Sequence, residues 1–279
     1  MITVLQVSDA HLSPRNGLFR RNFARVRKWV DRARPDLVVA TGDLSLDGAG
    51  RDEDMEFAAA AHHALPAPML AVPGNHDVGS HARTMPRQPV DGARLARFRR
   101  HLGKDRWVRD LPGWRLVGLN SEVMGTGHDE EATQAAFAEA AAAEAGDRRI
   151  ALFLHKPVFV SAPGDSTFDY WSVPPHARDS LAPLLCHPGL RLVASGHLHL
   201  HRRFDIGAVL FAWAPPLSFV VHPREQEGLP GERLCGALVH RLHGDRAETE
   251  LLVPHGMETP SLDDVRAETY PREPEPAGG

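Results

Sequence analysis

The chain has 279 residues, with 32 Lys and Arg against 36 Asp and Glu, so its formal net charge is −4. This balance excludes a polybasic nucleic-acid surface as the dominant feature. Hydrophobic residues at 42% and charged residues at 24% are typical of a soluble globular protein and exclude a disordered one, and the length allows one large α/β domain or two small ones.

The chain begins with an apolar run, residues 2–7, that predicts a first strand. It lacks the basic flank of a signal peptide, and no stretch approaches the ~18 consecutive apolar residues of a membrane-spanning helix. The two cysteines, Cys186 and Cys235, cannot form a disulfide framework and are interpreted as buried thiols in a reducing compartment. We therefore expect a cytoplasmic protein with no membrane partner.

Further short apolar runs follow along the chain, and each ends in polar residues. Such runs are typical of strands buried on both faces. They occupy residues 37–40, 69–72, 116–119, 150–154 and 192–194. Ligands of open α/β sheets bind beyond the carboxyl ends of the strands, so these polar ends predict one site assembled from across the chain.

Helical patterns separate the early strands. Apolar residues recur at helical spacing, and Gly103 and Gly146 mark two of the helix ends. The predicted helices span residues 19–33, 52–62, 91–102 and 132–145. Alternation of strand and helix over residues 1–77 predicts parallel strands joined by right-handed crossovers, and hence an α/β fold.

The last third of the chain has a different pattern. Residues 209–212, 234–242 and 248–253 predict strands separated by turns, which favours an antiparallel portion. From residue 259 the chain is acidic and rich in proline. We expect a single domain over residues 1–258, followed by a surface arm or disordered tail over residues 259–279.

Seven residues at or just beyond the predicted strand ends carry groups that bind metals. Asp9 and His11 are separated by one residue, and side chains at i and i+2 of a strand face the same way. His197 and His199 repeat this spacing. The other three, Asp43, Asn75 and His155, each follow an apolar run.

Carboxylate and imidazole donors suit Zn²⁺, Mn²⁺, Fe or Co ions. Seven donors are too many for one tetrahedral ion, but they suit two ions that share a carboxylate, about 3.5–4 Å apart. Each motif alone also fits a turn or a helix cap. Their conjunction, in this order and at successive strand ends, favours a dinuclear metal site.

The ordered set Asp9-x-His11, Gly42-Asp43, Gly74-Asn75-His76-Asp77, His155 and Gly196-His197-x-His199 resembles the calcineurin-like metallophosphoesterases. Among them it is most similar to bacterial phosphodiesterases of the class III cyclic-nucleotide and glycerophosphodiester type. The motifs span residues 9–199. The resemblance implies a four-layer αββα sandwich with the dinuclear centre between the two sheets.

The resemblance also implies a role for each residue. Asp9, His11 and His199 would bind the first metal, Asn75, His155 and His197 the second, and Asp43 both. His76 would lie beside the substrate phosphate without binding a metal. From there it would donate a hydrogen bond to a phosphate oxygen or protonate the leaving group.

One position departs from the pattern, because Lys156 stands where many cyclic-nucleotide members have a second histidine. The ligand His155 is kept, but cyclic nucleotides are not singled out as substrates.

The expected activity is hydrolysis of small-molecule phosphodiesters by a metal-bridging hydroxide. A phosphomonoesterase would need the same donors. A non-catalytic binding scaffold is disfavoured because every ligand and His76 are present, and a nuclease is disfavoured by the charge of −4.

Several residues near these motifs allow two interpretations. Asp77 would orient His76 or another ligand, or it would cap the following turn. Asn120 supports the site or is a plain turn residue. The loop with Phe168, Tyr170 and Trp171 stacks on an aryl group or base, or packs onto the core. The native substrate, the native metals and the choice between monomer and homo-oligomer stay open.

Overall fold

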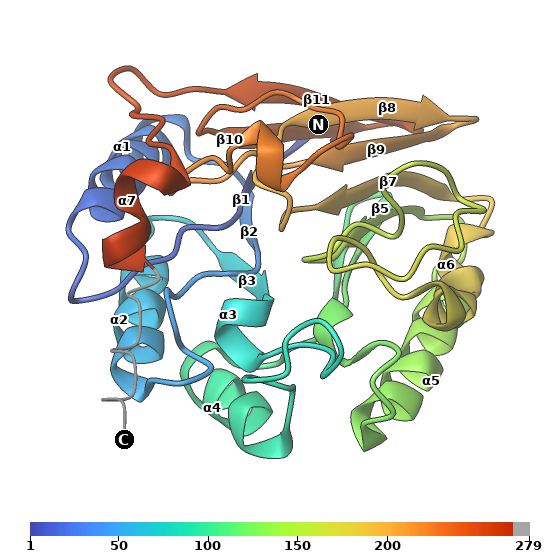
Figure 1. Ribbon diagram of the computed structural model, residues 1–279. Helices are drawn as coiled ribbons and strands as arrows, with labels where there is room; N and C mark the ends of the chain where they lie inside the picture. The colour runs from blue at the N-terminus through green and yellow to red at the C-terminus, as the bar shows by residue number, and fades with distance from the viewer. Residues whose placement is uncertain (270–279) are drawn as a thin grey trace.

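The computed structural model describes residues 1–269, and the last part of the predicted tail lies outside them. Two mixed sheets stand face to face in the centre (Figure 1). Helices α1 (Leu18–Ala33) and α2 (Asp52–His63) cover the outer face of one sheet, and α5 (Asp129–Ala143) and α6 (Ala182–Leu185) cover the other. The predicted four-layer αββα sandwich is confirmed.

The first sheet has five strands in the order β11-β10-β1-β2-β3. Strands β1, β2 and β3 are parallel, whereas β10 pairs antiparallel with both β1 and β11. The parallel start and the antiparallel end of the chain, both predicted, thus share one sheet. The strands are β1 (Ile2–Val7), β2 (Leu37–Thr41), β3 (Met69–Val72), β10 (Ala237–His243) and β11 (Arg246–Leu252).

The second sheet has six strands in the order β4-β5-β6-β7-β9-β8. Both strands that the sequence pattern did not predict, β4 and β8, form its edges. Edge strands carry charged residues on exposed positions, as in Trp-Val-Arg-Asp-Leu of β4, so their apolar pattern is weak. The strands are β4 (Trp107–Leu111), β5 (Trp114–Gly118), β6 (Arg149–Phe153), β7 (Leu190–Ser195), β8 (Arg202–Ile206) and β9 (Val209–Trp213).

Strand alternation divides the core into three layers. In β2, Val38 packs toward α1 and α2, whereas Val39 packs between the two sheets. In β6, Leu152 packs toward α5 and α6, whereas Phe153 packs between the sheets. Because both faces of these strands are buried, their sequences are continuous apolar runs. The packed middle layer fixes the position of the strand ends of one sheet relative to those of the other.

The helices begin and end where local sequence favours it. Helix α4 (Gly92–Leu102) begins at Asp91, whose side chain accepts a hydrogen bond from Arg94 N at 2.8 Å. Helix α5 begins three residues before its predicted start, and its first turn holds three acidic residues that favour the positive end of a helix. The short helices are α3 (Asn75–Val78) and the 3₁₀ turns Ser121–Val123, Pro175–Leu181 and Pro223–Glu225.

The two cysteines differ in exposure. Cys235 is buried, as the sequence interpretation expects. Cys186 is exposed instead, because it caps the carboxyl end of the short helix α6 at the surface. Both thiols are free in the structure.

The first part of the predicted arm contains helix α7 (Leu262–Thr269). Its buried residues Leu262 and Val265 pack in one cluster with Phe19 and Phe219. The domain boundary at residue 258 stays a prediction, and residues 270–279 lie outside the described range. None of the helices between residues 1 and 269 has both the length and the apolar character needed to span a membrane.

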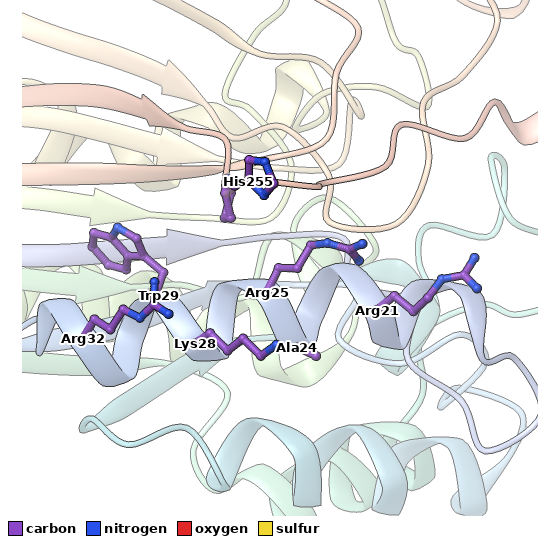
Figure 2. A pocket seen from close by; sticks show the side chains of 8 residues that line it. Arg21, Ala24, Arg25, Lys28, Trp29, Arg32 and His255 are labelled. Carbon is purple, nitrogen blue, oxygen red and sulfur yellow. The ribbon is translucent and has the colours of Figure 1, made fainter.

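A surface groove of about 570 Å³ runs along α1 (Figure 2). It is lined by four basic side chains of that helix, Arg21, Arg25, Lys28 and Arg32, together with Trp29 and His255. Arg21 and Arg25 share one counter-ion, Glu258. None of the seven predicted ligands lines this groove; all seven lie at the strand ends.

Candidate metal centre

The structure gathers all seven predicted ligands at the carboxyl ends of strands from both sheets. Asp9 and His11 follow β1, Asp43 follows β2, Asn75 follows β3, His155 follows β6, and His197 and His199 follow β7. Every one of these side chains is buried. Residues up to 190 positions apart in sequence therefore share one site, as the pattern predicts for parallel strands with a common polar edge.

Left-handed backbone turns aim these side chains. Five of the seven have positive φ angles: Asp9 (52°), His11 (45°), Asp43 (49°), His197 (69°) and His199 (53°). Within residues 1–269, Arg34 is the single other non-glycine residue with such an angle. This conformation is unfavourable for residues with a side chain, and it concentrates at functional sites.

The turns also correct one piece of the sequence reasoning. Strand alternation predicts that Asp9 and His11 face one ion, but both residues lie beyond the end of β1 at Val7. His197 and His199 likewise lie beyond the end of β7 at Ser195. Their side chains converge because the backbone turns sharply at each of these residues.

Asp43 stands between two groups of donors. Its Oδ2 lies 3.6 Å from His11 Nε2 and 3.5 Å from His155 Nε2. On the first side, His199 Nε2 lies 3.3 Å from His11 Nε2 and 3.4 Å from Asp9 Oδ1. The first group is therefore Asp9, His11 and His199 with Asp43.

The second group lies on the other side of Asp43. His155 Nε2 is 3.2 Å from His197 Nδ1 and 3.2 Å from Asn75 Oδ1. In each group, every nitrogen or oxygen donor lies within 3.6 Å of another donor, a separation that one cation with ligand distances of about 2 Å can span. The assignment of these two groups to two metals stays a prediction.

The buried donor atoms are better satisfied by metal cations than by their contacts with one another. Asp9 Oδ1 is buried and accepts no hydrogen bond within the described part of the chain. Burial alone would raise the pKa of Asp43, yet His155 and His76 hold it well below its ordinary value. Burial alone would lower the pKa of His155, yet the Asp43 carboxylate raises it to about 10. Divalent ions would neutralise this buried carboxylate and use the imidazole nitrogens that face it.

Backbone carbonyls fix the orientation of imidazole rings in both groups. His155 Nδ1 donates to Thr41 O at 2.7 Å, and His199 Nδ1 donates to Phe219 O at 2.6 Å. A ring nitrogen that donates to a carbonyl leaves the opposite nitrogen deprotonated in the neutral ring. The opposite nitrogens are those that face Asp43 and Asp9, which is the arrangement found around bound metals.

Two glycines allow the loops to approach closely. A Cβ atom on Gly42 would lie 2.3 Å from His155 Nδ1, and one on Gly74 would lie 2.2 Å from Asp43 Oδ1. Both distances are shorter than van der Waals contact. The glycines that precede Asp43 and Asn75 in their motifs are therefore required by packing against the ligands.

Asp77 binds two of the ligand loops together. Its carboxylate accepts hydrogen bonds from Gly74 N at 3.0 Å, Leu44 N at 3.1 Å, and Ser45 N and Oγ at 3.0 and 2.6 Å. It therefore caps α3, as one of its two interpretations states, and also holds the loop that carries Asp43. Burial, aided by the Asp43 charge, raises the pKa of Asp77 to about 6.

His76 lies beside Asp43 and the first donor group. Its backbone N–H donates to Asp43 Oδ1 at 2.8 Å, and its Nδ1 donates to Leu46 O at 2.8 Å. The His76 ring lies 4.6 Å from the His11 ring, edge to face. One ring nitrogen lies within 4.8 Å of donor atoms of both His11 and Asp43. At 8% exposure, it is the most accessible residue in this inner set.

The structure distinguishes the two interpretations of Asn120 and gives the contacts of the aromatic loop. Asn120 accepts a hydrogen bond from Glu122 N at 2.9 Å and caps a 3₁₀ turn, so it is a turn residue. In the aromatic loop, Phe168 lies under the Arg83 guanidinium at 4.2 Å, and Trp171 packs on a core cluster. Tyr170 contacts two of the predicted ligands, Asn75 and His197, through hydrogen bonds.

Lys156 is a buried cation beside the site. Its Nζ donates to Ser80 Oγ at 2.7 Å and lies 3.2 Å from Glu122 Oε2. The sequence pattern gave no role to Ser80 or Glu122, because neither belongs to a motif. The one signal in the sequence is Lys156 itself. A lysine that is buried directly after a predicted ligand needs a carboxylate nearby to balance its charge.

Comparison with known proteins identifies the family. The family model for calcineurin-like phosphoesterases matches residues 2–201. The chain is 29% identical over 262 residues to the 3',5'-cyclic adenosine monophosphate phosphodiesterase CpdA of Pseudomonas aeruginosa, covering 89% of this chain and 88% of that protein. It is 30% identical over 173 residues to the glycerophosphodiester phosphodiesterase GpdQ of Enterobacter lignolyticus, covering 58% of this chain and about half (51%) of that protein.

Solved structures share the fold at low sequence identity. A dimetal phosphatase from Danio rerio superposes with a TM-score of 0.63 at 16% identity, covering 90% of this chain and 96% of that one. The purple acid phosphatase PPD1 of yellow lupin gives a TM-score of 0.64 at 12% identity, covering 99% of this chain and 57% of that one. The chain therefore belongs to the calcineurin-like phosphoesterase family, and it is a metal-dependent phosphoric ester hydrolase.

Proposed function

We propose that this protein is a phosphodiesterase with two divalent metal ions, and that it cleaves small-molecule phosphodiesters. The observation that carries this proposal is the position of Asp43 Oδ2, 3.6 Å from His11 Nε2 and 3.5 Å from His155 Nε2. A single carboxylate oxygen placed between two donor groups suits a bridging ligand. Asp9, His11 and His199 would hold one ion, and Asn75, His155 and His197 the other.

Two divalent ions held by these residues would supply a water acidic enough to attack near neutral pH, and they would offset the negative charge of the phosphate. The chain's own residues do the rest. The Thr41 and Phe219 carbonyls hold His155 and His199 in fixed orientation, so the donor geometry exists before substrate binds. His76 is held through its Nδ1 by Leu46 O, and we assign its ring to the departing or non-bridging phosphate oxygen.

The names of the relatives support a diester over a monoester. CpdA and GpdQ are both named as phosphodiesterases, and CpdA aligns over nearly all of this chain. We do not single out cyclic nucleotides, because Lys156 replaces the second histidine that many cyclic-nucleotide members carry. A cytoplasmic location and a small-molecule phosphate ester as the partner belong to the same proposal.

The test is a substrate panel on protein reconstituted with Mn²⁺. Cyclic nucleotides, glycerophosphodiesters and bis(p-nitrophenyl) phosphate are compared with their monoester counterparts by kcat/KM. We expect diesters to be cleaved faster than monoesters, and chelation or Asp43→Ala to abolish both activities. Faster cleavage of monoesters would make the protein a phosphomonoesterase, and no cleavage of any ester by metal-replete protein would favour a binding scaffold.

A further inference from the structure

Tyr170 contacts two of the predicted ligands of the second metal. It lies in the segment between β6 and the 3₁₀ turn Pro175–Leu181. Asn75 Nδ2 donates to Tyr170 Oη at 3.0 Å, and His197 Nε2 donates to the Tyr170 backbone carbonyl at 3.0 Å. The Tyr170 ring also packs 4.7 Å from the His197 ring. One residue thus contacts the outer side of both ligands.

The contact to Asn75 matters because an amide has only one end that can bind a cation. Oδ1 carries the lone pairs, whereas Nδ2 carries two hydrogens. With Nδ2 bonded to Tyr170 Oη, Oδ1 lies 3.2 Å from His155 Nε2, inside the second donor group. A half-turn of the amide would present hydrogens to the ion. By accepting from Nδ2, the phenol oxygen holds this weakest donor of the set with Oδ1 toward the second donor group.

The surroundings of Tyr170 hold the phenol in place. Its ring lies 5.5 Å from Lys156 Nζ, and that ammonium is fixed by Ser80 and by the buried Glu122. On the other side, Trp171 N and Ser172 N donate to Asp169 Oδ1 at 2.8 and 2.9 Å, which sets the turn around Tyr170. Lys156, at the position where this chain departs from the histidine pattern, thereby supports the same tyrosine.

We propose that Tyr170 is a positioning residue for the second metal, acting through the Asn75 amide. The proposal rests on the proposed function, because it takes Asn75, His155 and His197 as ligands of one ion. It also gives the aromatic loop a role that differs from both base stacking and core packing. Residues that orient metal ligands typically change metal affinity 10- to 100-fold when they are removed.

The test is a titration of the metal-free full-length protein with Mn²⁺. Binding is monitored by calorimetry and by the electron paramagnetic resonance signal of free Mn²⁺. Tyr170→Phe removes the phenol oxygen and keeps both the ring and the backbone carbonyl. We expect the dissociation constant of one of two sites to rise about 10- to 100-fold, with the other site unchanged. Phe168→Leu, in the same loop and packed against Arg83 rather than a ligand, should leave both constants as in wild type.

A second background separates orientation from packing. In Asn75→Asp, either carboxylate oxygen can bind the ion, so orientation no longer limits binding. In this background, adding Tyr170→Phe should change Mn²⁺ affinity only slightly. An equal loss with and without the Asn75→Asp substitution, or no loss in either background, would overturn the orienting role. Wild-type protein that binds fewer than two ions would instead contradict the proposed function itself.

Discussion

Asp43 Oδ2 lies 3.5 Å from His155 Nε2, which joins the carboxyl end of β2 in the first sheet to that of β6 in the second. The same oxygen also faces His11 Nε2 at 3.6 Å, so this contact lies at the junction of the two donor groups. The site therefore depends on the packing of the two sheets as much as on any one motif.

Asp43→Ala should remove far more activity than loss of any single outer ligand. The substitution takes an anionic donor away from both donor groups at once. Asn75→Ala should mainly weaken one ion, because a neutral amide is a poorer ligand than a carboxylate or imidazole. Titrating Mn²⁺ back into each variant while following kcat/KM measures both effects.

Asp47→Ala is the matched control for Asp43→Ala. Asp47 lies in the same loop, but its carboxylate accepts from Gln88 Nε2 at 2.8 Å, away from the donor groups. This variant should keep wild-type metal affinity. Equal metal affinity in Asp43→Ala and wild type would show that the bridging role is misassigned.

His76→Ala should lose more rate on alkyl diesters than on aryl diesters. An alkoxide needs a proton or a strong hydrogen bond as its bond to phosphorus breaks, whereas a nitrophenolate hardly does. General acid–base catalysis is typically worth about 10²–10⁴-fold, which sets the expected loss on alkyl diesters. The measurement is kcat/KM across leaving groups of different pKa, with metal content checked in parallel.

The way in which the loss of kcat/KM varies with the leaving group distinguishes two roles of His76. A uniform loss would mean that the ring stabilises phosphate charge rather than the departing oxygen. Loss of a metal ion would mean that His76 is itself a ligand, since one of its ring nitrogens lies within 4.8 Å of donor atoms of His11 and Asp43.

The buried His62 should make stability depend on pH. Burial lowers the pKa of His62 to about 4, against about 6.5 in an unfolded chain. As pH falls from 6.5 to 4, the unfolded state takes up a proton that the folded state does not. The free energy of unfolding therefore loses up to about 3 kcal/mol over that window, and the contribution is complete above it.

Urea unfolding of the metal-free protein at several pH values measures this dependence. His62→Gln should flatten the slope between pH 4 and 6.5, because glutamine carries no proton there. The His63 charge is the smaller of the two causes that lower the pKa of His62, so the control His63→Gln, at the exposed neighbouring position, should keep most of the wild-type slope. A slope unchanged by His62→Gln would contradict the assignment.

Much of the fold follows from local sequence. Strands such as β2 and β6 are buried on both faces, so their apolar runs are unbroken and each ends close to a polar ligand. The edge strands β4 and β8 are not predicted in this way, because part of each strand faces solvent. Polar residues therefore take the place of about half of the apolar ones, and the apolar run is broken.

The sequence predicts which residues gather at the strand ends, but it predicts less of their geometry. The order of Asp9, His11 and the other motif residues pointed to two metals, but the left-handed turns that aim them leave no pattern in the sequence. The contact of Tyr170 with Asn75 joins positions 95 residues apart, and neither spacing nor composition could reveal it.

The most direct test of the dinuclear account is a metal count. Protein reconstituted with Mn²⁺, freed of excess ion and analysed by elemental mass spectrometry should carry about two ions per chain, and Asp43→Ala should carry fewer. Full phosphodiesterase activity in wild-type protein with one ion or none per chain would contradict the account.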